Sequence, residues 1–166
     1  MVRASGAIGA AGGQAPRIAS WSATWFGAGL LPWAPGTWGS LVALPLAWLL
    51  MAAGGALLLL AAAVLVFALG LWASDRYMKA VGVHDPGAIV IDEVAGQWLT
   101  LAVAPLDPLA YLLGFVLFRI ADVLKPWPAN WLDRRVGGAF GVMIDDVAAA
   151  VYAGGVLGIL VTWALP

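Results

Sequence analysis

The sequence predicts an all-α integral membrane protein, a multi-helix bundle of about five membrane-embedded helices with a charged site at the cytoplasmic face. Hydrophobic residues make up 63% of the 166-residue chain. Charged residues make up only 10%, against roughly 25% in a typical soluble domain. The mean hydropathy of +0.96 and the ten tryptophans, a residue type that anchors proteins at the membrane interface, point the same way.

The composition also excludes several classes of function. The formal net charge of -1 lacks the basic excess of a nucleic-acid-binding surface, so we expect no nucleic-acid partner. The chain has no cysteine and a single histidine, His84. Disulfides, a cysteine nucleophile and zinc sites built on several histidines are therefore excluded. The sequence leaves the oligomeric state open.

The chain is expected to consist of an N-terminal tail, residues 1–20, and one membrane-embedded domain, residues 21–166. The tail is rich in small residues and lacks the apolar core of a cleaved signal peptide, so we expect it to be flexible.

The first long apolar stretch predicts a helical hairpin. Residues 40–73 contain no charged side chain and correspond to about 51 Å of helix, more than one bilayer core requires. Gly54-Gly55 is predicted to divide this stretch into helices near 40–53 and 56–74. The first of these is short and contains a proline, so the sequence leaves open whether it crosses the membrane fully.

A second hairpin and a final helix complete the predicted bundle. The apolar region 94–121 is interrupted by the sequence APLDPLA, whose prolines disfavour helix. We therefore predict a tight turn between helices near 87–104 and 109–124, followed by a last helix near 147–165.

The basic residues predict the orientation of the bundle. With the turns at 54–55 and 105–108 on one side, all eight Lys and Arg residues fall on the other side, which the positive-inside rule assigns to the cytoplasm. Eight of the nine acidic residues fall there as well, although acids contribute little to topology. A mixed-charge site at the cytoplasmic membrane boundary is therefore predicted.

The stretch HDPGAIVIDEVAGQW contains the first candidates for chemistry. Asp85 followed by Pro86 fits a helix N-cap and first-turn proline, which predicts that a helix begins there. On this helix Asp92 and Glu93 share one broad face near the bilayer, where ionisable side chains usually have a function. The alternative is that these acids only favour the helix dipole.

Basic and acidic residues alternate at the end of the next helix. Arg119, Asp122 and Lys125 follow one another at intervals of three, so they share one side of the helix. Such a group can bind a phosphate through its cations while the acid holds a metal ion. The alternative is a self-neutralising ladder near the lipid headgroups.

Three further stretches add weaker candidates. Arg134, ahead of two glycines, can grip a phosphate or simply mark topology. Asp145 and Asp146 lie side by side, although one acid would suffice as a helix cap. Thr37 and Ser40 can cap the first helix or contact a phosphate.

Together these residues suit metal-assisted phosphoryl chemistry. Carboxylates without clusters of histidine or cysteine are ligands for Mg²⁺ or Mn²⁺. The residues alone predict a cytoplasmic-facing membrane site for an anionic ligand, with a phosphorylated ligand favoured. An ion-coupled transporter is the alternative, but a carrier site is expected near the membrane midplane. The Asp-Gly-x-x-Ala-Arg pattern of CDP-alcohol phosphotransferases is absent.

Four motifs together resemble a known family. APGTWGS, HDPGAIVIDEVAG, FRIADVLKPWP and DRRVGGAFGVMIDDVAAAVYAG are similar to those of bacterial phosphatidylglycerophosphatase A, in the same order, across residues 29–157. The resemblance implies an all-helical, multi-pass enzyme of the bacterial cytoplasmic (inner) membrane that acts in phospholipid biosynthesis. It would use Mg²⁺ to hydrolyse its lipid substrate, phosphatidylglycerophosphate, to phosphatidylglycerol and inorganic phosphate.

The resemblance carries over the motif positions Thr37, Ser40, His84, Asp85, Asp92, Glu93, Asp122, Lys125, Asp133, Arg134, Asp145 and Asp146. We expect the metal at Asp92, Glu93, Asp122, Asp145 and Asp146. We expect the substrate at Arg119, Lys125, Arg134, Thr37 and Ser40. The catalytic set is expected to be Asp85, Asp92, Glu93, Asp122 and His84, with His84 either protonating the leaving glycerol oxygen or stabilising its loop. A covalent aspartyl-phosphate stays open, although the Asp-x-Asp signature of haloacid-dehalogenase-like enzymes is absent.

Overall fold

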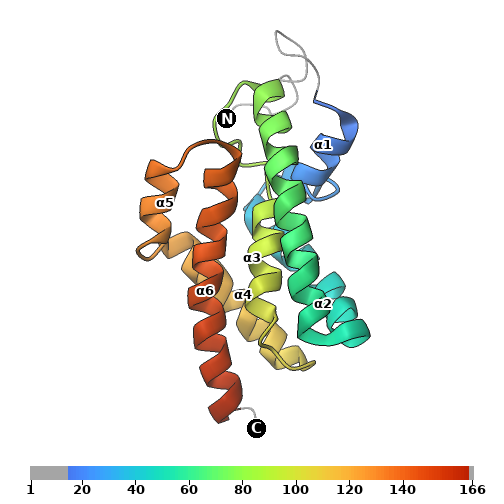
Figure 1. The fold of residues 1–166 in the computed structure, drawn as a ribbon, viewed down its shortest axis with the longest axis vertical. Coiled ribbons are helices and arrows are strands. Elements are labelled where there is room, and N and C mark those ends of the chain that lie inside the picture. Colours follow the sequence, from blue (N-terminus) through green and yellow to red (C-terminus); the bar gives the residue numbers. More distant parts are fainter. Residues whose placement is uncertain (1–14, 165–166) are drawn as a thin grey trace.

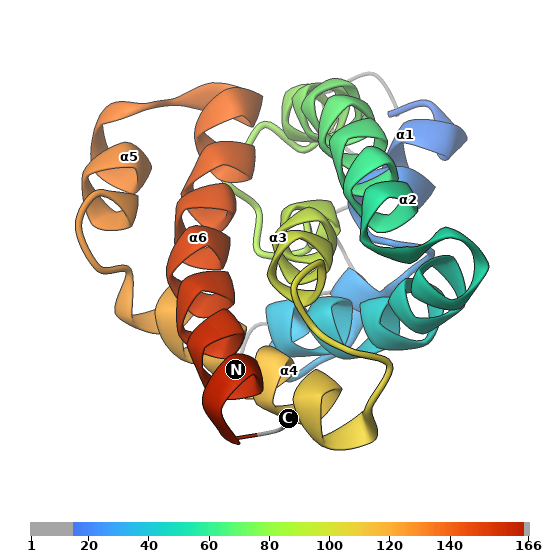
Figure 2. The ribbon, with the colours of Figure 1, turned by 60° about the horizontal axis from the view of Figure 1, so that its bottom comes forward.

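The computed structural model describes residues 15–164, and every regular element in this range is a helix, as the sequence predicts. In chain order the elements are α1 (Arg17–Ala23), the short 3-10 helix η1 (Ala28–Leu30), α2 (Pro35–Val81), α3 (Ile91–Leu101), α4 (Pro108–Leu124), α5 (Ala129–Arg135) and α6 (Gly138–Ala164). The short helix α3 lies at the centre of the bundle (Figure 1; Figure 2). By length and composition, α2 and α6 are each able to cross a membrane.

The N-terminal region differs from the prediction. α1 begins at Arg17, so residues 17–20 belong to a helix although we expected them in the tail, and residues 1–14 lie outside the described residues. α1 is held in place because Ala23 is fully buried and its carbonyl oxygen accepts a hydrogen bond from the Val90 N–H at 2.9 Å. This bond ties α1 to the segment that leads into α3.

Gly54 and Gly55 break α2 into a hairpin, as predicted. Gly54 has φ -153° and ψ 15°, and Gly55 has φ 66° and ψ -165°. The conformation of Gly55 is essentially restricted to glycine, because a Cβ would collide with the backbone. The first half of α2 begins at Pro35 rather than at residue 40 and is about 28 Å long, close to the thickness of a bilayer core.

The start of α3 contradicts the predicted cap. α3 begins at Ile91, and Asp85 lies before it in a loop with φ 103°, so Asp85-Pro86 does not start this helix. α3 is only about 16 Å long, half the thickness of a bilayer core, and α2, α4 and α6 pack around it. Its first turn carries Asp92 and Glu93, so both carboxylates lie at one end of the buried core.

The turn between α3 and α4 agrees with the prediction. Asp107 Oδ1 accepts a hydrogen bond from the Ala110 N–H at 2.9 Å. Pro108 is the first residue of α4, where a missing N–H costs no helical hydrogen bond. This turn, the Gly54-Gly55 turn and the C-terminal end of α6 all lie at the end of the bundle away from α5 (Figure 1).

α6 begins at Gly138, well before the predicted start near residue 147. Asp145 and Asp146 therefore lie about two turns inside the helix and cannot cap it. Gly96 allows α3 to approach both neighbouring helices, because a Cβ there would lie 2.6 Å from the Phe118 ring on α4 and 3.1 Å from the Asp146 carbonyl oxygen on α6. This close approach lets the acids of α3 and α6 share one site.

Candidate active site

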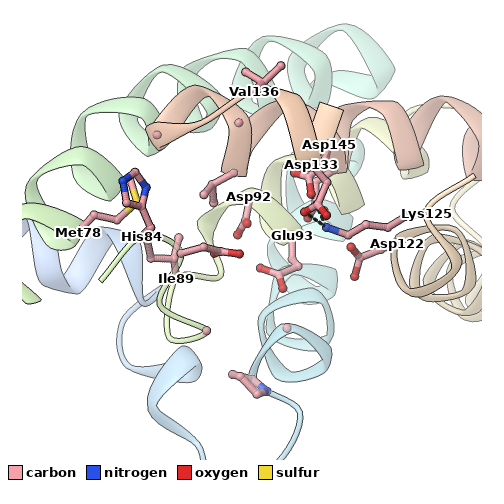
Figure 3. A pocket seen from close by; sticks show the side chains of 18 of the residues that line it. Met78, His84, Ile89, Asp92, Glu93, Asp122, Lys125, Asp133, Val136 and Asp145 are labelled. Carbon is pink, nitrogen blue, oxygen red and sulfur yellow. Dashed lines mark hydrogen bonds and ion pairs between the residues drawn. The ribbon is translucent and has the colours of Figure 1, made fainter. Parts of the chain in front are cut away.

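Seven of the nine acidic residues line one cavity of about 450 Å³, between the first turns of α2 and α3, the end of α4 and the beginning of α6 (Figure 3). They are Asp85, Asp92, Glu93, Asp122, Asp133, Asp145 and Asp146. The other two acids have structural partners, since Asp75 pairs with Lys79 at 2.8 Å and Asp107 caps α4. Seven of the eight acids that the sequence assigns to one face thus line a single cavity, and Asp75 is the exception.

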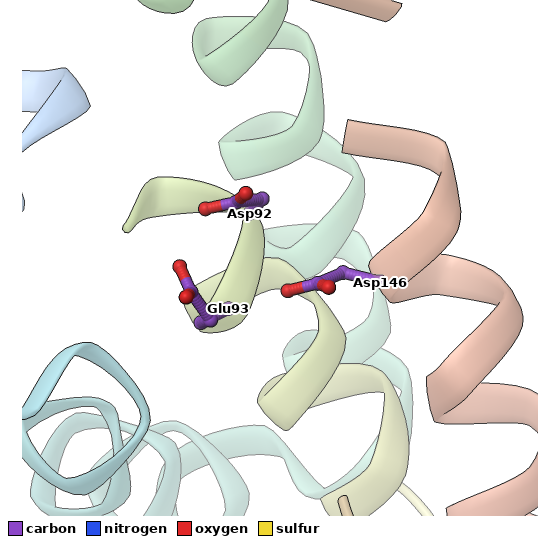
Figure 4. Close-up of side chains that lie close together, drawn as sticks. All are labelled: Asp92, Glu93 and Asp146. Carbon is purple, nitrogen blue, oxygen red and sulfur yellow. The ribbon is translucent and has the colours of Figure 1, made fainter. Parts of the chain in front are cut away.

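Three of these carboxylates converge from α3 and α6 (Figure 4). One oxygen each of Asp92, Glu93 and Asp146 lie within 4.8 Å of one another. Each residue also has a buried oxygen with no hydrogen-bond partner: Asp92 Oδ1, Glu93 Oε2 and Asp146 Oδ2. Buried carboxylates without partners are strongly unfavourable unless a cation or a proton neutralises them. Oxygen ligands 2.0–2.6 Å from one ion are typical of Mg²⁺ and Ca²⁺, so these three residues fit a divalent cation.

Arg119 of α4 lies beside this trio. Its Nη1 is 2.7 Å from Asp122 Oδ2 and 3.9 Å from Glu93 Oε1. The closer contact is an ion pair without hydrogen-bond geometry, so Nε and Nη1 have no hydrogen-bond partner. A mostly buried guanidinium with free N–H groups can bind an incoming anion, because its fork of donors matches phosphate and carboxylate oxygens.

Lys125 links three elements at the other side of the cavity. Its Nζ donates hydrogen bonds of 2.6 Å to Asp133 Oδ1 on α5 and of 2.6 Å to Asp145 Oδ2 on α6 (Figure 3). Burial lowers the pKa of Lys125, but the two hydrogen bonds outweigh it and raise this pKa above its ordinary value. Lys125 is therefore held in its charged form, and Asp145 already has a cation where the neighbouring Asp146 has none.

The loop before α3 contributes His84 and Asp85. Both residues are exposed and line the cavity, and Figure 3 labels His84. Partial desolvation raises the pKa of the Asp85 carboxyl, and the nearby Lys125 ammonium only partly opposes this effect. Asp85 is thus a carboxyl whose affinity for a proton exceeds that of a free aspartate.

Three predicted substrate contacts are not at the cavity. Arg134 is exposed on α5, and Thr37 and Ser40 are absent from the cavity lining. Ser40 is fully buried, and its hydroxyl donates to the Gly36 carbonyl oxygen at 2.9 Å. Because α2 already begins at Pro35, neither hydroxyl caps the helix. The geometry gives no support to a substrate contact by these three side chains.

The residue of the first motif that does matter for the cavity is Gly36, which the sequence analysis did not single out. A Cβ on Gly36 would lie 2.1 Å from Glu93 Oε1 and 3.1 Å from Arg119 Nη1. The glycine therefore leaves room for these two charged groups, whereas a methyl group would displace the end of the Glu93 side chain. Its position in the first turn of a helix, where glycine has no structural advantage over alanine, was the available signal.

The fold and the cavity define a class of protein: an all-helical protein with membrane-length helices and a carboxylate-rich cavity that also contains an arginine and a lysine. Comparison with known proteins narrows this class. The family model described as phosphatidylglycerophosphatase A matches residues 21–161, and the chain belongs to that family.

Curated relatives agree with the family model. Phosphatidylglycerophosphatase A of Escherichia coli (strain K12) is 44% identical over 133 residues, which cover 80% of this chain and 77% of the relative. The protein of the same name from Haemophilus influenzae is 42% identical over 129 residues, 77% of this chain and 79% of the relative. A putative phosphatidylinositol-3-phosphatase of Bacteroides thetaiotaomicron is 38% identical over 138 residues, 78% of this chain and 85% of the relative. No solved structure matches significantly.

The Lys125 hydrogen bonds predict a stability effect. Lys125→Met leaves Asp145, whose side chain is only 8% exposed, without its cation, so we expect a loss of about 1–3 kcal/mol in the free energy of unfolding. The measurement is reversible unfolding in detergent. Lys79→Met is the matched control, because the exposed Lys79–Asp75 pair contributes at most about 1 kcal/mol. Equal losses in the two variants would contradict a structural role for the buried pair.

Proposed function

We propose that this protein hydrolyses phosphatidylglycerophosphate to phosphatidylglycerol and inorganic phosphate, as a step of phospholipid biosynthesis. The observation that carries the proposal is the convergence of Asp92, Glu93 and Asp146 beside Arg119, in a chain that belongs to the phosphatidylglycerophosphatase A family. The site combines unpartnered oxygen ligands for a cation with free donors for a phosphate.

Electrostatics supports a metal ion in this site. Seven carboxylates and only two cationic side chains, Arg119 and Lys125, line the cavity, so its formal charge is strongly negative when all of them are ionised. A phosphate monoester would be repelled from such a cavity unless bound cations reverse the local potential. We propose that Asp92, Glu93 and Asp146 hold Mg²⁺, or Mn²⁺ in its place. When bound, the ion would neutralise phosphate oxygens and make water a better nucleophile.

Two acids expected in the metal set have other partners here. Asp122 is paired with Arg119, and Asp145 with Lys125. We therefore assign them to orienting the two cations toward the substrate phosphate. When the phosphate binds, it would replace part of the contact between Arg119 and Asp122. The remaining contact with Asp122 would keep the guanidinium pointing into the cavity.

The reaction itself moves two protons. The oxygen of water bonds to phosphorus, the bond between phosphorus and the glycerol oxygen breaks, and the glycerol oxygen takes up a proton. The phosphate formed from the attacking water releases one proton, which restores the proton donor. His84 and Asp85 line the cavity from the loop before α3, and we assign His84 as the proton donor. Asp85, whose pKa is raised, lies next to it and would hold the imidazole in place.

The transporter alternative receives no support. The relatives that match most of the chain are named as phosphatases. The cavity also lies where helices begin and end, rather than midway along them.

We further propose a five-span topology with the cavity at the cytoplasmic boundary. The two halves of α2, then α3, α4 and α6 would be the membrane-embedded helices. Exposed tryptophans support this placement, because Trp33 and Trp127 lie in the segments at the cavity end and Trp163 lies at the far end of α6. Tryptophan is enriched at both membrane interfaces, so these side chains mark two belts.

The proposed function predicts metal-dependent release of phosphate. Purified protein in detergent micelles should release inorganic phosphate from phosphatidylglycerophosphate with Mg²⁺, and chelation should reduce the rate at least about 100-fold, because the buried acids lose their cation. No release from this lipid at any Mg²⁺ concentration would refute the phosphatase proposal.

Single amide replacements test the assigned ligands in the same assay. Asp92→Asn, Glu93→Gln and Asp146→Asn should each reduce kcat by about 100-fold or more, since each removes a charged ligand. Asp75→Asn, outside the cavity, is the control and should retain activity. If all three site variants kept normal rates, the metal assignment would be wrong even though the family is right.

The close approach at Gly36 predicts a steric effect on the site. Gly36→Ala should reduce kcat about tenfold or more, because the new methyl group displaces the Glu93 carboxylate and the Arg119 guanidinium. Gly87→Ala is the matched control: Gly87 lines the same cavity, but a Cβ there meets nothing within 4 Å. Equal activities of the two variants would show that Glu93 need not occupy its observed position.

The proposed topology can be tested with fused reporters. Alkaline phosphatase fused after Pro166 should be active, because the C-terminus would lie outside the cytoplasm. A green fluorescent protein fused at the same position should not fluoresce, because it does not fold after export in an unfolded state. A fusion after Arg135, at the end of α5, should give the reverse pattern. A cytoplasmic signal from the Pro166 fusion would be incompatible with five spans.

A further inference from the structure

A second pocket lies where α4 packs against α6, and most of its lining residues belong to these two helices. It measures about 190 Å³, and we call it the α4–α6 groove. Its walls include Leu117, Ile120 and Leu124 of α4 and Val156 of α6. Tyr152 supplies the only polar side-chain atom of the lining, and its hydroxyl is already used, since it donates a hydrogen bond to the Trp127 carbonyl oxygen. The groove therefore offers an entirely hydrocarbon surface.

Consecutive residues of the chain line the groove and the acidic cavity. Leu124 and Pro126 line the groove, while Lys125 between them lines the cavity and pairs with Asp145. Lys125 adopts a left-handed conformation, with φ 43°, at the end of α4. The same change in direction thus presents hydrocarbon to the outside and an ammonium group to the cavity.

The direction of the groove follows the helices away from the cavity. Leu117 to Leu124 covers about 10 Å along α4, roughly a third of a bilayer core. On α6, Val156 lies about 15 Å beyond Asp146, farther from the end of the helix that forms the cavity. A hydrocarbon chain in the groove would therefore leave the cavity level and run into the membrane.

Several side chains that line the groove are exposed and can contact a hydrocarbon chain. Leu124 is 73% exposed, Ile120 50% and Val156 45%. Under the proposed function, a ligand that fills both sites carries a phosphate at one end and a hydrocarbon chain at the other, which is the chemistry of a lipid with a phosphorylated headgroup.

We propose that the α4–α6 groove binds one acyl chain of the lipid substrate and thereby positions its terminal phosphate over the acidic cavity. This proposal rests on the proposed phosphatase function and adds to it the site that holds the lipid tail. The lipid would enter sideways from the membrane, between α4 and α6, and its headgroup would pass Lys125.

The groove can be tested by filling it with a larger side chain and measuring the steady-state kinetics of the variant. Val156→Trp should raise the KM for dipalmitoyl phosphatidylglycerophosphate about five- to tenfold, which corresponds to lost contact with about one or two methylene groups. It should leave kcat/KM for the dibutyryl analogue within about twofold of the wild type, because chains this short do not occupy the groove. Val151→Trp is the matched control, since Val151 is 70% exposed on the same helix but does not line the groove.

The outcomes separate the two proposals. If the wild type hydrolyses neither lipid, the proposed function fails. If the wild type is active and Val156→Trp behaves as Val151→Trp does, or impairs both lipids equally, only the groove proposal fails.

A labelling experiment on the wild type keeps the proposal testable if Val156→Trp does not fold. The protein is placed in phosphatidylglycerol vesicles that contain phosphatidylglycerophosphate with a diazirine on one acyl chain, without Mg²⁺, and illuminated. Adducts on the peptides around 117–124 and 152–156 that excess unlabelled substrate removes would support the groove. Adducts spread over all exposed helix faces, or obtained equally with a diazirine phosphatidylcholine, would overturn it, because the groove would then hold only bulk lipid.

Discussion

The burial of three carboxylates, each with an oxygen that lacks a hydrogen-bond partner, is the constraint on which the rest of this structure depends. Asp92, Glu93 and Asp146 have oxygens that are removed from water and lack hydrogen bonds. Such an arrangement is unstable by itself, so the surrounding elements must both force it and make it useful. Gly96 brings α3 against α6, and Gly36 brings the start of α2 against Glu93. Residues that lack a side chain thus bring the charges together.

The cationic side chains divide the acids of the cavity into two groups. Lys125 neutralises Asp133 and Asp145, and Arg119 neutralises Asp122, while the trio on α3 and α6 has only the distant Arg119, 3.9 Å from Glu93. This division separates two tasks that one cavity must perform. The unpartnered acids suit a bound metal ion, and the paired cations stay oriented toward a phosphate. Adjacent residues such as Asp145 and Asp146 therefore belong to different groups.

The short helix α3 explains why the cavity exists at all. A helix of about 16 Å does not reach as far as α2, α4 and α6, which pack around it and are longer, so space remains above its first turn. The loop that precedes α3 does not close this space, because its end is hydrogen-bonded to α1. The cavity is thus left open to water and ligands at the end where the charged residues lie.

The sequence by itself determined the helical class, the break at Gly54-Gly55 and the turn at Asp107, because each depends on local properties: apolar length, glycine conformation and proline. It also determined the family, through four separate motifs. Most residues of the site could be named in the same way, since an acid in an apolar chain is costly wherever it is placed.

Only the tertiary structure decided how those residues work together. Residue type predicted Thr37 and Ser40 as the substrate contacts of their motif. The structure instead places Gly36 against Glu93 and Arg119, which lie far along the chain. Likewise, Lys125 donates a hydrogen bond to Asp145, twenty residues later in the chain, and not to the adjacent Asp146. These pairings depend on distances of a few ångströms between helices, because electrostatic energies change strongly at that range. Helix packing sets the distances, so they cannot be predicted from local sequence patterns.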